Sequence, residues 1–290
     1  MSRQVALVCC ALIAAAIAAS PSARGQELEG RLKKIADTRT LSIAYRADAT
    51  PFSFVGDKAE PVGFSIDLCR RVAASIERQL KVSGLKIEWV AVSVESRFDA
   101  VAKGRADMEC GSSTMTLSRM KQVDFSSAIF VETTGLLART TSNLRSISDL
   151  TGKKIAVVAG TTNERAIRAQ LERRRLDAAV LPFKSRDEAL AALEDGKADA
   201  FASDRLLLVG AASKAKDPRA LTLLPDQLSL EPYAIVLPRG DAAMRLAVNT
   251  ALAHLFAGDE ITEMLRRWFG ALGRPSTLLE AVYALGAIPE

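Results

Sequence analysis

Histidine and cysteine are scarce in this sequence of 290 residues. There is one histidine, His254, and there are four cysteines, two of which lie in an apolar N-terminal run. A Ser-His-Asp triad and a Cys/His metal site both require histidine beside further reactive residues or ligands, whereas His254 stands alone in the amphipathic stretch "ALAHLFAG". We interpret His254 as structural and expect no catalytic residue, no metal and no cofactor.

Aromatic residues and clustered charge are also limited. Aromatics make up 5% of the chain, and the formal net charge is +5 with the basic residues scattered. Nucleic-acid-binding domains concentrate basic residues on one face, so we expect no nucleic-acid partner. The three arginines at 173–175 suggest either a docking patch or, more simply, a solvated helix face. The apolar content of 49% is typical of a soluble globular protein.

The chain has one long apolar run, at its N-terminus. Arg3 precedes residues 5–19, which are almost all Ala, Val, Leu, Ile or Cys, and small residues at 23 and 25 have the spacing of a cleavage site. The run is shorter than the about 20 apolar residues of a membrane span. Residues 1–25 are therefore predicted to be a secretory signal peptide, with an N-terminal anchor helix as the alternative. The mature protein is expected to be exported.

Export would leave two cysteines, Cys69 and Cys110, in an oxidising compartment. Two cysteines in such a compartment can pair. Cys69 lies in a predicted helix and Cys110 at the end of a predicted strand. Two buried thiols are the alternative, and the spacing does not decide between them.

The remaining chain alternates between strand and helix patterns, twice over. Strands are predicted at 40–48, 85–92 and 106–110, with helices at 65–80 and 96–104 between them; the pattern recurs with strands at 153–160, 178–183 and 198–204 and helices at 161–175 and 185–196. This alternation predicts an α/β protein with mainly parallel sheets. Extended segments at 128–140 and 230–240 would cross between the two units, which suggests a hinge. Two helices that meet at Gly258-Asp259 end the pattern.

The stretch "ECGSSTMTLSR" is a candidate anion site. Ser112 and Thr114 follow a predicted strand, and Arg119 comes shortly after. If residues 112–116 open a helix, their N–H groups and the helix dipole favour a negative group. Arg119 could then bind both oxygens of a carboxylate. A capping run followed by a surface arginine is the alternative.

The second unit offers a comparable corner. Thr161 and Thr162 follow Gly160 between a strand and a helix, where either can cap the helix or donate to a ligand. Asp204 ends another strand, and its carboxylate can either hold an ammonium group or cap the next helix. In open α/β sheets, ligands lie beyond the carboxyl ends of strands. A ligand with a carboxylate and an ammonium group is an amino acid.

Arginines at the strand ends of the first unit suggest a second acidic group on that ligand. Arg46 and Arg97 occupy this edge together with Arg119. Three arginines exceed the need of one α-carboxylate, and unpaired buried charge costs several kcal/mol. The inference holds only if all three face one cleft and no protein acid already neutralises them. It predicts a doubly anionic ligand.

Five motifs, in order, resemble those of the periplasmic amino-acid-binding proteins of ABC transporters. They are "GFSIDLCRRVA", "SRFDAVAKGRADMECGSSTMTLSRMKQVDFS", "LTGKKIAVVAGTTNE", "ALEDGKADAFASD" and "EPYAIVLPRGD", and the likeness covers residues 41–269. The glutamate/aspartate-binding branch is the most similar. The resemblance implies a type II periplasmic binding protein fold, a clamshell of two α/β lobes joined by two crossing strands. Lobe 1 is expected at 26–135 and 233–290, and lobe 2 at 136–232.

The resemblance also implies roles for individual residues. Arg119 and Thr114, helped by Thr161 and Thr162, would hold the α-carboxylate; Asp204 and Ser112 would hold the α-ammonium group; and Arg46 and Arg97 would bind the side-chain carboxylate. In that branch a histidine of the side-chain pocket aligns with Arg186, and a serine aligns with Val94, between Ser93 and Ser96. These departures leave glutamate against aspartate, and other dicarboxylates, open. The family pattern is also compatible with a Cys69–Cys110 bridge.

The expected partners are an amino acid ligand and an inner-membrane ABC permease, with the protein acting as a periplasmic monomer. Glutamine or another polar amino acid is the first alternative ligand. A periplasmic dehydratase on the same fold is a further alternative, because a fold does not decide a function. It would need an acid or base of tuned pKa in the cleft, and the only free acid predicted there is Asp204.

Overall fold

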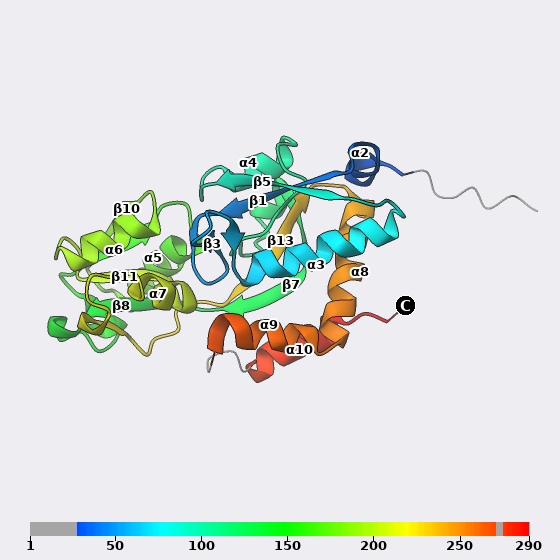
Figure 1. Cartoon of the computed structure of the whole chain (residues 1–290). Helices are drawn as coiled ribbons and strands as arrows, with labels where there is room; N and C mark the ends of the chain where they lie inside the picture. The colour runs from blue at the N-terminus through cyan, green and yellow to red at the C-terminus, as the bar shows by residue number, and fades with distance from the viewer. Residues whose placement is uncertain (1–27, 271–274, 290) are drawn as a thin grey trace, which may run out of the picture.

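The computed structural model of the protein describes residues 28–270 and 275–289. The predicted signal peptide, residues 1–25, lies outside the described residues. The described chain forms two α/β bodies, called lobe 1 and lobe 2 here, each around its own five-stranded sheet (Figure 1). Within the described ranges, no helix is long and apolar enough to cross a membrane.

Lobe 1 contains the beginning and the end of the described chain. The strands of its main sheet, in spatial order, are β5 (Lys86–Val92), β1 (Thr40–Arg46), β6 (Met108–Glu109), β13 (Glu231–Pro238) and β7 (Val123–Glu132). The helices of this lobe are α2 (Gly30–Thr38), α3 (Phe64–Gln79), α4 (Arg97–Ala102), α8 (Ala242–Ala257), α9 (Glu260–Phe269) and α10 (Thr277–Gly286). A small antiparallel sheet of β2 (Asp48–Ala49), β3 (Ser53–Val55) and β4 (Pro61–Val62) follows β1.

Lobe 2 repeats this strand order with the middle of the chain. Its sheet consists of β10 (Ala179–Phe183), β9 (Lys154–Val158), β11 (Ala200–Asp204), β8 (Thr134–Arg139) and β12 (Leu221–Leu223). Its helices are α5 (Thr162–Arg174), α6 (Arg186–Glu194) and α7 (Arg205–Ala212). Short 3-10 turns complete the chain: η1 (Arg119–Lys121), η2 (Thr140–Ser142), η3 (Ile147–Leu150) and η4 (Pro218–Ala220).

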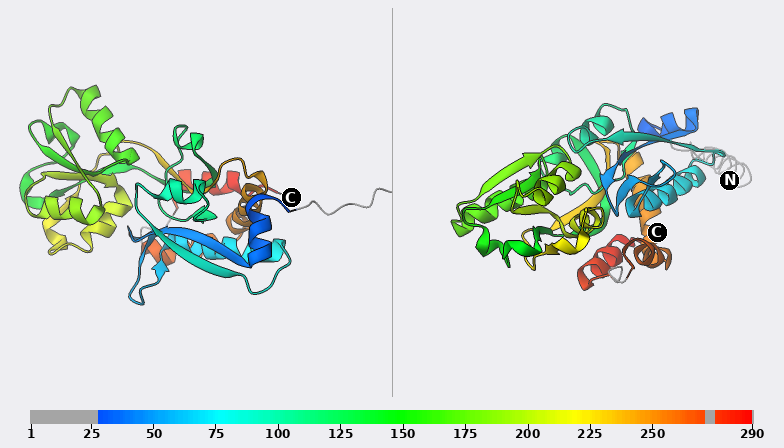
Figure 2. Two further views of the ribbon diagram at one scale, coloured as in Figure 1. Left: turned by 90° about the horizontal axis from the view of Figure 1, so that it is seen from above. Right: turned by 60° about the vertical axis from the view of Figure 1, so that its left-hand side comes forward.

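The sheets are mixed rather than mainly parallel. β1 is parallel to β5 and β6, and β9 is parallel to β10 and β11, as the alternating pattern predicts. β13, however, runs antiparallel to β6 and β7, and β8 runs antiparallel to β11 and β12. The antiparallel strands include the segments that cross between lobes: β7 continues through Thr133 into β8, and β13 returns the chain to lobe 1 (Figures 1 and 2). Neighbouring parallel strands need a crossover connection between them, usually a helix. The strands that enter directly from the other lobe lack this connection, so they pair antiparallel.

Both sheets are buried on two faces, which explains their apolar strands. In lobe 1 four aromatic rings pack together in the core: Phe64 of α3, Phe269 of α9, Phe130 of β7 and Phe52. Tilted and edge-on ring pairs of this kind add to the free energy gained by burial. In lobe 2 two smaller clusters, aliphatic in one case and including Phe201 in the other, cover the two faces of the sheet. The two lobes therefore have separate cores.

The lobes also touch each other across the cleft between them. Leu207 of α7 packs into the lobe 1 core, and Val94 of lobe 1 packs into a lobe 2 cluster. Gly210 of α7 lies so close to the Thr50 carbonyl that a Cβ atom at position 210 would come within 2.2 Å of the oxygen. Glycine is needed there because only a residue without a side chain permits this approach. The structure therefore has the two lobes in contact.

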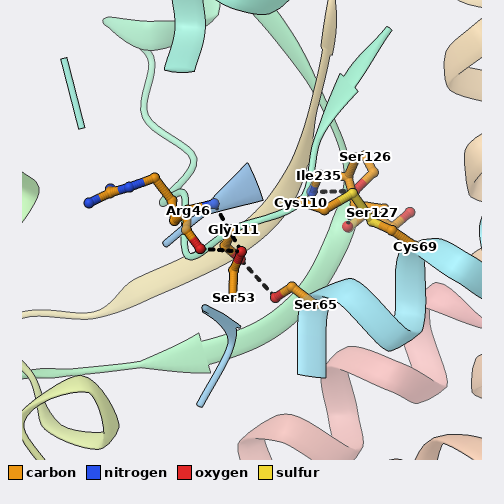
Figure 3. The surroundings of a disulfide bond; sticks show 9 residues. All are labelled: Arg46, Ser53, Ser65, Cys69, Cys110, Gly111, Ser126, Ser127 and Ile235. Atoms are coloured by element: carbon orange, nitrogen blue, oxygen red, sulfur yellow. Dashed lines mark hydrogen bonds between the residues drawn. A yellow bond between two sulfur atoms is a disulfide. The ribbon is translucent and has the colours of Figure 1, made fainter. Parts of the chain in front are cut away.

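A disulfide joins Cys69 of α3 to Cys110, the residue after β6, which confirms the pairing (Figure 3). The Cα atoms are 6.4 Å apart, and both residues are fully buried. Nearby, Ser65 Oγ of α3 donates a 2.7 Å hydrogen bond to the Gly111 carbonyl (Figure 3). Helix α3 is thus fixed at two points to the segment that leaves β6.

Candidate functional site

A buried pocket between the lobes is lined by all nine predicted site residues. Lobe 1 and lobe 2 both contribute, and Val94 and Asn163 complete the lining. The nine are Arg46, Arg97, Ser112, Thr114, Arg119, Thr161, Thr162, Arg186 and Asp204. The structure therefore brings the candidates together; their roles toward a ligand stay predictions.

The segment 112–116 does not begin a helix, so that expectation is wrong. Thr114 forms a bridge with Tyr233 of β13. The Met115 N–H donates to the Pro232 carbonyl at 2.8 Å, and the Ala234 N–H donates to the Ser113 carbonyl at 3.1 Å. These bonds hold the backbone extended along the crossing strand. Residues 112–116 therefore provide no helix dipole, and the positive charge beside them comes from the Arg119 side chain.

Thr114 connects the corner to the hinge and to the opposite lobe. Its Oγ1 atom donates to Glu231 Oε2 at 2.8 Å and lies 3.3 Å from Thr162 Oγ1 of lobe 2. Arg119 is fixed beside it, because its Nη1 atom donates to the Thr114 carbonyl at 2.7 Å. The Arg119 guanidinium also lies 4.9 Å from the ring centre of Phe98.

Phe98 is an organising residue that sequence reasoning missed. The guanidinium of Arg97 lies 4.6 Å from the same ring centre, so that two pocket arginines share one aromatic ring. Such cation–π contacts fix the direction of a guanidinium without using its N–H donors. Arg97 Nη1 donates to the Val94 carbonyl at 2.9 Å.

The pocket arginines are strongly desolvated. Burial, followed by repulsion from a neighbouring arginine, lowers the pKa values of Arg46, Arg97 and Arg119 to about 10. All three remain cationic at neutral pH. The Nε atoms of Arg46, Arg97 and Arg186 are buried and have no hydrogen-bond partner among the described residues. Buried unpaired donors are rare in proteins, and here all three belong to residues that line one pocket.

Arg46 does have an acidic neighbour, which corrects the charge argument made from the sequence. Its Nη2 atom lies 2.5 Å from Asp48 Oδ1, and Asp48 Oδ2 lies 3.4 Å from Arg186 Nη1 of lobe 2. Arg46 is therefore not an unneutralised cation. Arg186, already among the predicted site residues, makes a fourth arginine in the lining beside Asp204, and Asp48 pairs with two of the four. In the pocket lining four arginines still face one acid, Asp204, while Asp48, Glu109 and Glu231 act on these arginines from outside the lining.

Glu109 lies behind the arginines and was also missed. It is fully buried, and neither carboxylate oxygen has a hydrogen-bond partner among the described residues. Burial raises its pKa, although Arg97 and Arg46 act in the opposite direction. Gly111 allows this packing, because a Cβ at that position would lie 2.2 Å from Glu109 Oε1.

In lobe 2 the two corners differ in chemistry. Thr161 caps α5: its Oγ1 accepts from the Glu164 N–H at 3.2 Å and donates to the Val158 carbonyl at 2.7 Å. Asp204 precedes α7 but makes no side-chain capping bond, which excludes the capping alternative. Its Oδ1 atom instead accepts from Asn163 Nδ2 at 2.9 Å. Burial, and next the nearby Glu231, raise the pKa of Asp204 to about 6.

Comparison with known proteins places this arrangement in a family. Residues 41–271 match the model of the bacterial extracellular solute-binding proteins, family 3. The chain belongs to this family. The L-glutamate/L-aspartate-binding protein of Pseudomonas aeruginosa is 35% identical over 91% of this chain and 87% of its own length. The glutamate/aspartate import solute-binding protein of Salmonella typhimurium is 29% identical over 82% of this chain and 79% of its own.

A solved structure supports the fold of this family 3 solute-binding protein. The crystal structure of an ancestral amino acid-binding protein, described as a precursor of cyclohexadienyl dehydratase, superimposes with a TM-score of 0.73. It is 26% identical and covers 83% of this chain and all of its own. The type II periplasmic binding protein fold predicted from the motifs is thereby confirmed.

Two further sequence observations can now be placed in the family 3 protein. Val94 lines the pocket, while Ser93 is exposed, Ser96 is half-buried, and the two serines bond to each other with their Oγ atoms 3.2 Å apart. The neighbouring serines therefore do not replace a hydroxyl at position 94. His254 lies in α8 and is not among the pocket residues. Within residues 28–270 and 275–289 there is no group of His, Cys, Asp or Glu side chains suited to a metal ion.

Asn163 is the remaining pocket residue that the sequence did not reveal. Its Nδ2 atom donates to Thr134 Oγ1 at 2.8 Å as well as to Asp204. Asn163 follows Thr162 in "GTTNE" and reads there as an ordinary residue of the first helical turn. Only the structure, which places α5 beside β11 and β8, gives it a role in orienting Asp204.

Proposed function

We propose that this protein captures an acidic amino acid, L-glutamate or L-aspartate, between its lobes and delivers it to an ABC permease from the periplasm. The relatives named above bind these amino acids by name. The observation that carries the proposal is the composition of the pocket: four arginines from both lobes converge, with Asp204 beside them. Four guanidinium groups and one carboxylate in the lining favour a ligand of net negative charge.

The proposed roles divide the pocket into two ends. Arg119 and Thr114, with Thr161 and Thr162 from lobe 2, hold the α-carboxylate through charge-assisted hydrogen bonds. Asp204 and Ser112 hold the α-ammonium group. Arg46, Arg97 and Arg186 form the distal end, where the free Nε donors of all three meet the side-chain carboxylate. Closing the lobes around the ligand buries both ends and gives the permease a closed complex to recognise.

A calorimetric screen of the twenty amino acids and small dicarboxylates tests the proposal. We expect L-glutamate or L-aspartate to bind at least tenfold more tightly than L-glutamine or L-asparagine. Equal or weaker binding of the acidic pair would overturn it. A thermal-shift titration with the same ligands provides an independent readout, since a ligand that binds the folded state raises Tm.

A polar, uncharged amino acid is the second candidate ligand, and one observation favours it. Asp48 already neutralises part of the charge of Arg46 and Arg186, which weakens the demand for a second carboxylate. L-glutamine in the same calorimetric screen separates the two candidates directly.

An enzymatic role on this fold is the remaining alternative. The similar ancestral protein is described as a precursor of a dehydratase. We propose a binding role because Asp204 is assigned to the ammonium group, which leaves no second acid or base in the pocket lining. Incubation with prephenate-like or arogenate-like cyclic carboxylates should yield no product, and a measurable turnover would contradict this assignment.

A further inference from the structure

We propose that Asp48 is a positioning residue for ligand specificity, which bridges Arg46 of lobe 1 and Arg186 of lobe 2 and thereby forms the distal carboxylate site when the lobes close. This inference rests on the proposed function and assigns a residue outside the pocket lining. Asp48 does not itself line the pocket, whereas both of its arginine partners do. It therefore acts through them.

The bridge connects elements that belong to different lobes. Asp48 stands in β2, two residues after Arg46, and Arg186 is the first residue of α6. One carboxylate oxygen of Asp48 faces Arg46 Nη2 at 2.5 Å, and the other faces Arg186 Nη1 at 3.4 Å. The two oxygen atoms of the Asp48 carboxylate thus contact one arginine from each side of the cleft.

The arrangement divides the donors of each arginine. Arg46 and Arg186 are 3% and 5% exposed, so that their guanidinium groups are almost fully removed from water. Asp48 occupies one Nη atom of each, while the Nε atoms stay buried without a partner among the described residues. A guanidinium has its donors in a fixed planar fork. Fixing one Nη atom therefore also fixes the direction in which the Nε–H group is presented.

Asp48 also removes a repulsion that would oppose closure. Arg186 is close enough to act on Arg46: the pKa of Arg46 is lowered by burial first and by Arg186 next. For Asp48, burial acts to raise the pKa, but Arg186 and Arg46 outweigh it, so that the pKa lies below its usual value. Asp48 is therefore ionised at neutral pH. An anion between them lowers the electrostatic cost of bringing the two guanidinium groups together across the cleft.

An acid in this position either competes with the ligand carboxylate or positions the arginines, and the two roles predict opposite changes in ligand affinity when the acid is removed. An Asp48 that merely competed with the ligand carboxylate would weaken binding, so that its removal would tighten it. An Asp48 that positions the arginines strengthens binding of ligands with a distal carboxylate. The bridging geometry, which leaves the Nε donors unoccupied, favours the second.

The test uses Asp48→Asn, which keeps the size of the side chain and removes its charge. We expect affinity for L-glutamate and L-aspartate to fall at least tenfold, while affinity for L-glutamine changes less than threefold. Asp37→Asn is the matched control, because Asp37 is an exposed acid of lobe 1 that pairs with Lys33; it should leave both affinities unchanged. A purely structural role would lower all affinities together.

A double-mutant cycle with Arg186→Gln tests the bridge from lobe 2. If Asp48 acts partly through Arg186, the loss of L-glutamate affinity caused by Asp48→Asn should be smaller in the Arg186→Gln background than in the wild type. Unchanged or tighter binding of acidic ligands by Asp48→Asn, or fully additive losses, would overturn the inference. Wild-type protein that binds neither acidic amino acid would overturn the proposed function as well, so that the wild-type titration distinguishes the two failures.

Discussion

Glu132 of β7 and Glu231 of β13 are paired opposite each other where the two strands cross between the lobes. Both are buried, at 5% and 2% exposure. The Glu231 carboxylate accepts hydrogen bonds from the hydroxyl groups of Thr114, Ser229 and Thr134. Within the part of the chain that the structure describes, the Glu132 carboxylate accepts backbone bonds alone, from Thr133 and Leu206. Burial, and next the nearby Asp204, raise the pKa of Glu132 to about 7.

The raised pKa of Glu132 predicts a pH-dependent stability. Between the ordinary value of 4.5 and about 7, the folded chain binds more protons at this group than the unfolded chain does. The free energy of unfolding therefore falls as pH rises through this window, by about 3 kcal/mol at most. Glu132→Gln should show a shallower decline between pH 5 and pH 8 in chemical denaturation. Glu263→Gln, at an exposed site on α9, should keep the wild-type slope; a wild-type slope for Glu132→Gln would contradict the prediction.

Ligand affinity should depend on pH in the opposite direction, through Asp204. This carboxylate must be ionised to hold an ammonium group, and its pKa in the protein without ligand is raised to about 6. Protonation of Asp204 therefore competes with binding below that value, and Kd should rise about tenfold between pH 7.5 and pH 5. Isothermal titration with L-glutamate measures this directly. Asp204→Asn should bind weakly at both values, with most of the pH dependence gone, whereas a flat wild-type profile would argue against an Asp204–ammonium pair.

Arg97 should discriminate between acidic and neutral ligands. Arg97→Ala removes one distal guanidinium, so that affinity for L-glutamate should fall about a hundredfold, and affinity for L-glutamine less than tenfold. Arg97→Lys keeps the charge but not the planar fork, and should recover only part of the loss. Titration calorimetry on both ligands gives the ratio. Equal losses for the two ligands would show that Arg97 does not contact the distal group.

The sequence predicted several residues that line the pocket because they lie at the ends of strands. Arg46 and Asp204 end parallel strands, and Thr161 begins a helix after such a strand, so that the general location of ligands in α/β sheets applied to them. The prediction that a helix begins at 112–116 was wrong, because the interaction that decides the backbone there is not visible in the local sequence pattern. The segment bonds to β13, more than a hundred residues further along the chain.

The acids around the arginines escaped prediction for a related reason. Asp48 follows Arg46 by two residues and is the last residue of the strand predicted at 40–48, yet the folded chain places its carboxylate between arginines of the two lobes. Glu109 lies within the strand pattern and faces the arginines only because Gly111 admits it. The helix α2, the strand β12 and the C-terminal helix α10 were also not anticipated. The charge balance of the pocket depends on residues that become neighbours only in the folded chain, whereas the ends of strands can be predicted from the sequence alone.

The disulfide should contribute strongly to stability because it closes a long loop. Cys69 and Cys110 are 41 residues apart in sequence, and the chain-entropy model gives about 4 kcal/mol for a loop of that size. The double variant Cys69→Ala/Cys110→Ala should therefore lose about 4 kcal/mol of unfolding free energy, or roughly 10 °C in Tm. Reduction of the wild-type protein should lower Tm by a similar amount and leave the double variant unchanged. A double variant with wild-type Tm would mean that the packing of α3 against β6, supported by the Ser65–Gly111 hydrogen bond, already fixes this segment without the covalent link.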